Sequence, residues 1–249
     1  MKSSFRAPAL AVAILGTLAT AHAQYSNPPS WMPMTMLNVS LNTANLRLDV
    51  VDEATMMGAG VYPVLTPAPL GTYDPAQPWS VLNGTAYSRR LGWDDGNRSN
   101  PDPSTHILNL VQTTYGSGAT LWIESMAQSP ELKCYLAVGM NGMGSPNSYS
   151  GIFGTAGSST KWQWDGMMDH NTYAVGLSGI TSPNELFSAT YRVYVGDSLG
   201  NEILNPDSSS ASTVETWIWQ GPATVPEPTA LSLAAMGIVS LWLCRRVKS

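Results

Sequence analysis

The sequence predicts an all-β fold, an antiparallel β-sandwich of jelly-roll type, for residues 24–224. Short segments alternate apolar and polar residues, which is the period of a half-buried strand. Gly, Pro, Asn and Ser gather between those segments, where turns require them. No stretch of helical length repeats apolar residues every 3.6 positions. Many short strands joined by turns are typical of sandwiches and jelly rolls.

The first alternating segments, residues 36–41 and 46–50, flank a turn-like stretch and are expected to pair as a hairpin. Residues 62–79 hold five prolines and are expected to form a surface loop with at most an edge strand. The pattern resumes at residues 106–111 and 119–124. The Gly-containing turn between these two segments predicts a second hairpin.

Further strands are expected at residues 133–138, 161–164, 172–177 and 213–219, and residues 141–159 are expected to be loop. The clearest strand spans residues 187–195, where apolar side chains occupy every second position. One apolar and one polar face predict a central strand of a half-buried antiparallel sheet. Its expected core-facing residues are Phe187, Ala189, Tyr191, Val193 and Val195.

The first 23 residues have the layout of a secretory signal peptide. A basic start is followed by an apolar run and by Ala21-His22-Ala23, a small-x-small cleavage site. Cleavage is expected between Ala23 and Gln24, so this segment takes no part in the fold.

The last 25 residues, 225–249, have three parts in order. Val225-Pro226-Glu227-Pro228 comes first, an uncharged apolar run follows, and Arg245 and Arg246 lie near the end. The apolar run is expected to form a single transmembrane helix, short for a bilayer but extended by outward-reaching arginines. Because arginines that follow an apolar run stay in the cytoplasm, everything before Val225 is expected outside.

This tail resembles the PEP-CTERM sorting signal of Gram-negative bacteria, and the resemblance covers only residues 225–249. It implies that the helix anchors the protein transiently in the inner membrane, and that an exosortase, a membrane transpeptidase-like protease, removes the tail. It also implies delivery to the cell surface or to an extracellular, exopolysaccharide-containing biofilm matrix. The resemblance carries no information on the chemistry of the delivered domain.

Charge and cysteine content narrow the classes of partner. The two terminal segments take five of the 12 basic residues and one of the 17 acidic ones, which leaves 7 basic and 16 acidic residues, a net charge of −9. An acidic surface repels phosphate backbones, so nucleic acid is not expected as a partner. Cys134 is alone in residues 24–224, so no internal disulfide is expected there.

One loop offers candidate calcium ligands. Asp94, Asp95, Asn97 and Asp102 surround Gly96, and calcium binds such hard oxygens. The spacing is not that of an EF-hand, and Arg98 lies among the oxygens. The alternative is an ordinary turn, where Asp, Asn and Gly are favoured for local reasons. No other cofactor is expected.

Two tryptophan pairs, Trp162 with Trp164 and Trp217 with Trp219, have members two residues apart. Residues two apart on a strand share a face. On the outer face each pair would form a platform on which sugar rings stack, as in a carbohydrate-binding module. On the inner face each pair belongs to the core, which is the favoured alternative because large aromatics dominate core burial.

No catalytic motif is apparent, and the domain is expected to be non-catalytic. His106 and His170 are too few for a three-histidine zinc site, and no Gly-x-Ser-x-Gly elbow flanks a serine. A secreted polysaccharide hydrolase remains the rival, with its carboxylates unassigned. A cleft with two carboxylates at catalytic separation, one with a perturbed pKa, would favour that rival.

Overall fold

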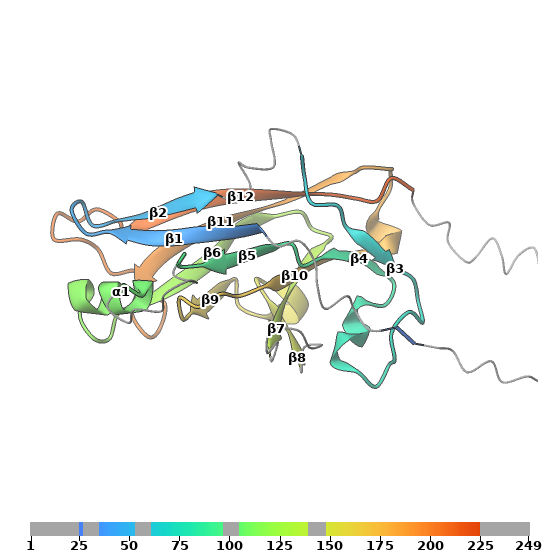
Figure 1. The fold of residues 1–249 in the computed structure, drawn as a ribbon, viewed down its shortest axis with the longest axis horizontal. Coiled ribbons are helices and arrows are strands. Elements are labelled where there is room, and N and C mark those ends of the chain that lie inside the picture. The colour runs from blue at the N-terminus through green and yellow to red at the C-terminus, as the bar shows by residue number, and fades with distance from the viewer. Residues whose placement is uncertain (1–24, 27–34, 53–60, 97–104, 139–147, 225–249) are drawn as a thin grey trace, which may run out of the picture.

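The computed structural model describes residues 25–26, 35–52, 61–96, 105–138 and 148–224 (Figure 1). Strands dominate the described chain, as the sequence predicts. They are β1 (Thr35–Asn42), β2 (Arg47–Asp52), β3 (Thr66–Ala68), β4 (Thr85–Ser88), β5 (Leu91–Asp94), β6 (Thr120–Gln128), β7 (Leu132–Val138), β8 (Ser148–Ile152), β9 (Lys161–Trp164), β10 (Asn171–Gly176), β11 (Leu186–Gly196) and β12 (Ser212–Gln220). One α-helix, α1 (Ile107–Tyr115), and short 3-10 turns, among them η2 (Pro78–Leu82) and η3 (Thr155–Gly157), join them.

The strands form three sheets with the orders β2-β1-β5, β3-β4-β10-β7-β8 and β12-β11-β6-β9. All their strand pairs are antiparallel except β1 with β5. The predicted first hairpin is confirmed as β1 and β2. The predicted central strand is confirmed as β11, which lies between β12 and β6.

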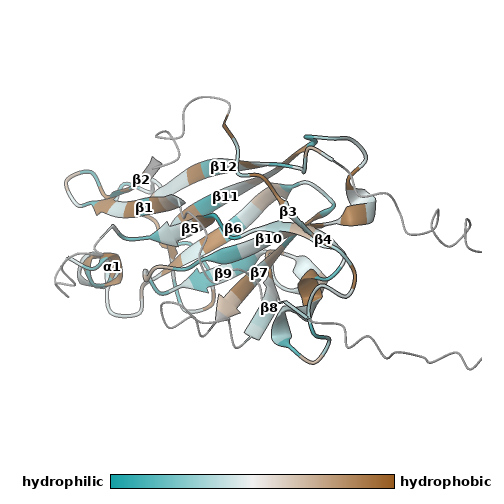
Figure 2. Ribbon diagram, turned by 45° about the vertical axis from the view of Figure 1, so that its right-hand side comes forward, coloured by the Kyte–Doolittle hydropathy of each residue, from teal (hydrophilic) through white to brown (hydrophobic). Residues whose placement is uncertain are grey.

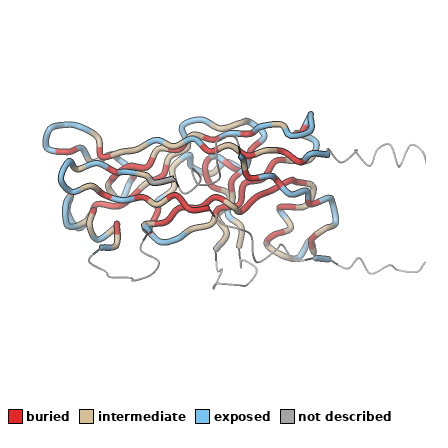
Figure 3. The backbone as a smooth tube through the Cα atoms, turned by 45° about the horizontal axis from the view of Figure 1, so that its top comes forward, coloured by how far each residue is buried: buried red, intermediate tan, exposed pale blue. Residues whose placement is uncertain are grey.

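One hydrophobic core is enclosed by the three sheets. Apolar and polar residues alternate along the strands (Figure 2), and the buried positions follow the middle of the sheets (Figure 3). Leu37 of β1, Tyr173 of β10 and Tyr191 of β11 are all buried in it. The predicted inner face of β11 is confirmed, since all five expected core residues are buried. Burial of this apolar face is the main stabilising term of such a sheet.

The predicted strand at residues 106–111 is wrong, because these residues begin helix α1. The helix is short and packs on β1 and β6 through Ile107 and Val111, four residues apart, with Leu110 between them. The side chain of His106 accepts a hydrogen bond from the Leu108 amide, and Gly116 at φ 102° ends the helix. These capping positions, rather than a long apolar stripe, mark it as a helix.

The predicted loop over residues 141–159 is also partly wrong, because β8 (Ser148–Ile152) pairs with β7 at the edge of its sheet. The glycine-rich composition of this stretch suggested a loop, but the strand requires a glycine at position 151. A Cβ at Gly151 would lie 2.6 Å from the Thr155 carbonyl oxygen, so η3 crosses the strand more closely than a side chain permits. The proline-rich stretch behaves as predicted, with only the edge strand β3.

Candidate functional site

The two predicted terminal signals lie outside the described residues. This holds for the sorting motif Val225-Pro226-Glu227-Pro228, for Arg245 and Arg246, and for the cleavage position between Ala23 and Gln24. Among the residues that the structure describes, no helix has the length and apolar character needed to span a bilayer. The prediction of export and sorting therefore rests on the sequence pattern alone.

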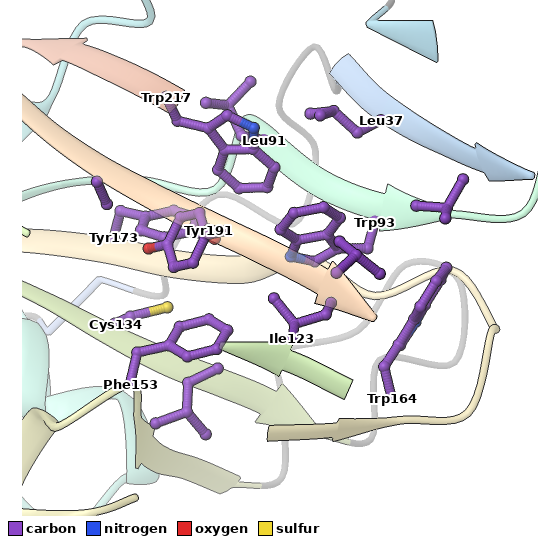
Figure 4. Close-up of a cluster of buried hydrophobic side chains, with 14 of the residues drawn as sticks. Leu37, Leu91, Trp93, Ile123, Cys134, Phe153, Trp164, Tyr173, Tyr191 and Trp217 are labelled. Carbon is purple, nitrogen blue, oxygen red and sulfur yellow. The ribbon is translucent and has the colours of Figure 1, made fainter. Parts of the chain in front are cut away.

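The tryptophan pairs are not sugar platforms. Trp164, Trp217 and Trp219 are buried, and Trp162 is half-buried with its ring against Phe153. Trp217 stacks on Trp93 with ring centroids 4.6 Å apart (Figure 4). Val214 lies on the opposite face of β12 and is 55% exposed. The strand turns the two indoles inward because they bury more apolar surface than the valine would. The core alternative is thus correct for these rings.

The structure describes two of the four proposed calcium ligands. Asp94 is buried at the end of β5, and Asp95 Oδ2 accepts a 3.4 Å hydrogen bond from the Ile107 amide of α1. The same oxygen lies 3.8 Å from His106 Nε2. Asn97 and Asp102 lie outside the described residues, and the described part holds no cluster of three or more acidic, His or Cys side chains arranged for a metal. Asp95 therefore accepts a hydrogen bond at the start of α1. Calcium binding by this loop remains a prediction.

An acidic pair that the sequence did not single out precedes β10. Burial and, to a smaller extent, the nearby Asp165 carboxylate together raise the pKa of Asp169 to about 6. The Asp169 backbone is held by hydrogen bonds in both directions with Trp93, 2.9 and 3.0 Å long. A Cβ at Gly92 would lie 2.4 Å from the Asp169 carbonyl oxygen, so the segment packs tightly on β5. A carboxyl group that titrates near pH 6 can donate or accept a proton close to neutrality.

A groove of about 420 Å³ opens beside the end of β6. Met126, Lys133 and residues 153–156 line it. Phe153 and Ala156 adopt positive φ values of 53° and 55°, a backbone conformation that L-residues rarely take. Thr155 Oγ1 accepts a 2.8 Å bond from the buried Cys134 amide, which fixes this wall to the sheet. The groove holds one cation among its described lining residues and no opposing catalytic pair.

A second, smaller cluster covers the outer face of the sheet β3-β4-β10-β7-β8, beneath η2. We call Tyr73, Tyr87, Tyr135 and Tyr149 the tyrosine cluster. The Tyr73 and Tyr87 hydroxyls share a 2.6 Å hydrogen bond, and the rings of Tyr135 and Tyr149 meet edge to face at 6.4 Å. Tyr73 and Tyr87 are buried, whereas Tyr135 and Tyr149 are half-buried at the edge. The cluster thus has a buried side and a side that is partly open to solvent.

Arg89 lies at the tyrosine cluster and is a buried charged residue. Its side chain is only 5% exposed, and its Nε atom is buried with no hydrogen-bond partner. Within the described residues no carboxylate forms an ion pair with it. Burial raises the pKa of Tyr87 and Tyr149, and the Arg89 charge opposes that rise in both.

Sequence reasoning missed Arg89 and its neighbours. The available signal was the adjacent pair Arg89-Arg90 in a domain with only 7 basic residues. Tyr149 lay in a stretch predicted as loop, so its place beside Tyr135 was not foreseeable. No protein-family model matches this chain, and no curated protein is similar to it.

Proposed function

We propose that the protein is an exported, non-catalytic protein of the cell surface or the exopolysaccharide matrix, and that an exosortase removes its tail. The observation that carries the proposal is the ordered tail of residues 225–249, together with the secretory signal of residues 1–23. The delivered part, residues 24–224, is then one β-sandwich domain of jelly-roll type. The mature protein begins at Gln24 and lacks the apolar helix.

The described domain supports this proposal in two ways. Its mostly antiparallel β-sheets with a continuous apolar core suit a protein that must stay folded outside the cell. Its single cysteine, Cys134, is buried, and burial raises the pKa of its thiol well above the usual value. A thiol held in this way resists oxidation and stray disulfide formation in an oxidising compartment.

The test is the mass of the protein recovered from cells. The full chain is expressed in a Gram-negative host that carries an exosortase and in the same host without it. We expect a surface-extracted protein that begins at Gln24 and ends near residue 228 only when the protease is present. The triple variant Pro226→Ala/Glu227→Ala/Pro228→Ala should keep the tail, whereas the neighbouring control Thr224→Ala should lose it. A mature surface protein that still ends at Ser249 would overturn sorting by cleavage.

Asp169 favours a second candidate, a secreted polysaccharide hydrolase. Its pKa of about 6, raised by burial first and by Asp165 second, suits a general acid, with Asp165 as the partner carboxylate. Release of reducing ends from a panel of acidic and neutral polysaccharides tests this. Asp169→Asn should abolish the release, and Asp49→Asn on the exposed side of β2 should not. A wild-type protein that releases no reducing ends from any of them rules the hydrolase out.

A further inference from the structure

Arg89 follows β4, which lies between β3 and β10 in its sheet. Ser88 pairs in register with Tyr173 of β10, so Arg89 lies next to Thr172 on the neighbouring strand. Side chains alternate between faces along a strand. Tyr173 belongs to the main core, so Thr172 and Arg89 lie on the outer face, with the tyrosine cluster. The register therefore places Arg89 and Thr172 on the same face of the sheet, and both lie close enough to Tyr149 to lower the pKa of its hydroxyl.

The positive charge of Arg89 has no counterpart in the described chain. Burying an unpaired charge is costly, and buried arginines are normally paired with a carboxylate. Arg192 shows the ordinary solution, because its guanidinium bonds Glu202 and, at 3.1 Å, the Ser210 hydroxyl. Arg89 is less exposed than Arg192 and has no such partner among the described residues. No negative charge in the described chain balances the Arg89 guanidinium.

The groups around Arg89 are neutral hydrogen-bond donors. The hydroxyls of Tyr149 and Thr172 are both buried and lie close enough to interact with each other, and neither has a further hydrogen-bond partner in the described chain. Burial raises the pKa of Tyr149, which keeps its proton in place, while Arg89 and the nearby Thr172 hydroxyl each lower that pKa. Trp79, in the same cluster, also has a buried Nε1–H without a partner. A cation with unsatisfied donors beside it is the arrangement that holds an oxyanion.

We propose that Arg89, Tyr149 and Thr172 bind the carboxylate of an acidic sugar. The ligand class rests on the proposed matrix function, whereas the oxyanion site rests on the geometry alone. One guanidinium balances one carboxylate, and its planar fork matches the two carboxylate oxygens. A phosphate dianion would leave excess negative charge in the site. The half-buried rings of Tyr135 and Tyr149 provide apolar surface for the CH face of the sugar.

The test uses two ligands that differ only at C6, methyl β-glucuronide with a carboxylate and methyl β-glucoside with a hydroxymethyl group. The full chain in detergent is titrated with each and with inorganic phosphate, by calorimetry and by thermal melting. We expect the glucuronide to bind and to raise the melting temperature, and the glucoside to do neither. Equal response to both sugars would refute carboxylate recognition. A stronger response to phosphate would refute the sugar ligand.

The variants separate a binding role from a structural one. Arg89→Met should abolish glucuronide binding and leave the ligand-free melting temperature unchanged or higher, since it removes an uncompensated buried charge. Tyr149→Phe deletes one hydroxyl and should weaken binding about tenfold, as expected for the loss of one hydrogen bond to a charged group. Arg47→Met, on an exposed residue of β2, removes the same charge and should change nothing. Glucuronide binding by Arg89→Met, or a clearly lower ligand-free melt, would overturn the site.

This experiment is independent of tail processing. A chain that binds glucuronide but keeps its tail in cells contradicts the sorting proposal and leaves the site standing. A chain that is processed but does not bind glucuronide contradicts the proposed site and leaves the sorting proposal standing.

Discussion

Trp217 is the side chain whose removal should show most directly that the tryptophan pairs are structural. Its indole stacks on Trp93 at 4.6 Å and meets the rings of Tyr191 and Tyr173 edge-on at 5.3 and 5.5 Å. Truncation of a buried tryptophan to alanine costs about 3–5 kcal/mol. Each aromatic contact adds roughly 0.5–1.5 kcal/mol beyond the buried area. We therefore expect Trp217→Ala to lower the free energy of unfolding by about 4–5 kcal/mol.

Trp217→Phe is the companion variant, because the alanine variant approaches the whole stability of a domain, about 5–15 kcal/mol. Phenylalanine keeps a ring in the stack and removes the indole Nε1–H, which is buried without a hydrogen-bond partner in the described chain. A buried unsatisfied donor costs about 1–3 kcal/mol, so part of the lost packing is offset and the net cost should stay below about 2 kcal/mol.

Urea titration followed by circular dichroism measures both variants. Val214→Ala on the same strand is the control, and because Val214 is largely solvent-exposed it should cost less than about 0.5 kcal/mol. If Trp217→Ala cost as little as Val214→Ala, the inward orientation of the pair would be refuted. A glycan platform on β12 would then be open again.

Three further substitutions test the strand faces, the acidic pair and the edge strand. Val193→Asp places an unpaired charge in the core and should unfold the domain in a denaturant titration, whereas Ser188→Asp, exposed on the same strand, should be tolerated. The pKa of Asp169 is raised from 3.8 to about 6, so its contribution to stability is present below about pH 4 and is lost as the pH rises through 6. Asp169→Asn should remove this pH dependence, which amounts to at most about 3 kcal/mol because solvent screening reduces the electrostatic effect. Urea midpoints of both proteins at pH 4 and pH 7 measure the difference. Gly151→Ala should cost about 1–3 kcal/mol, because its Cβ would meet a backbone carbonyl oxygen at 2.6 Å, and Gly118→Ala, with no atom within 4 Å of its Cβ, should be near neutral by thermal melting.

Strand alternation predicted most of the fold because it reports burial directly. The inner face of β11 and the β1–β2 hairpin follow from where apolar residues fall in the sequence. Alternation failed at residues 106–111 because a nine-residue helix needs only one buried turn. There Ile107 and Val111 share a face in a strand and in a helix alike, whereas Leu110 joins them on that face only in a helix. A short apolar run does not separate the two readings, and the capping residues decide.

The candidate site was less predictable because it depends on pairing between distant strands. Arg89 and Thr172 are neighbours only because β4 and β10 pair in one particular register, and Tyr149 joins them through β7 and β8. The aspartates around Gly96 stood out in the sequence because they are close along the chain. Proximity along the chain predicted a calcium site or a turn there, and it did not predict that Asp95 accepts a hydrogen bond from the first amide of α1. The buried cation of Arg89 became visible only in three dimensions.

The two faces of the sheet β3-β4-β10-β7-β8 divide stability from recognition. Along β10, Tyr173 points into the main core, while Thr172 points to the tyrosine cluster. Along β7, Cys134 and Tyr135 divide in the same way. Because successive side chains alternate, a change at Arg89 or Tyr149 alters the outer face without removing a contact of the main core. Loss of ligand binding in those variants therefore reports on the site itself, whereas a loss of stability would show that the outer face is needed for folding.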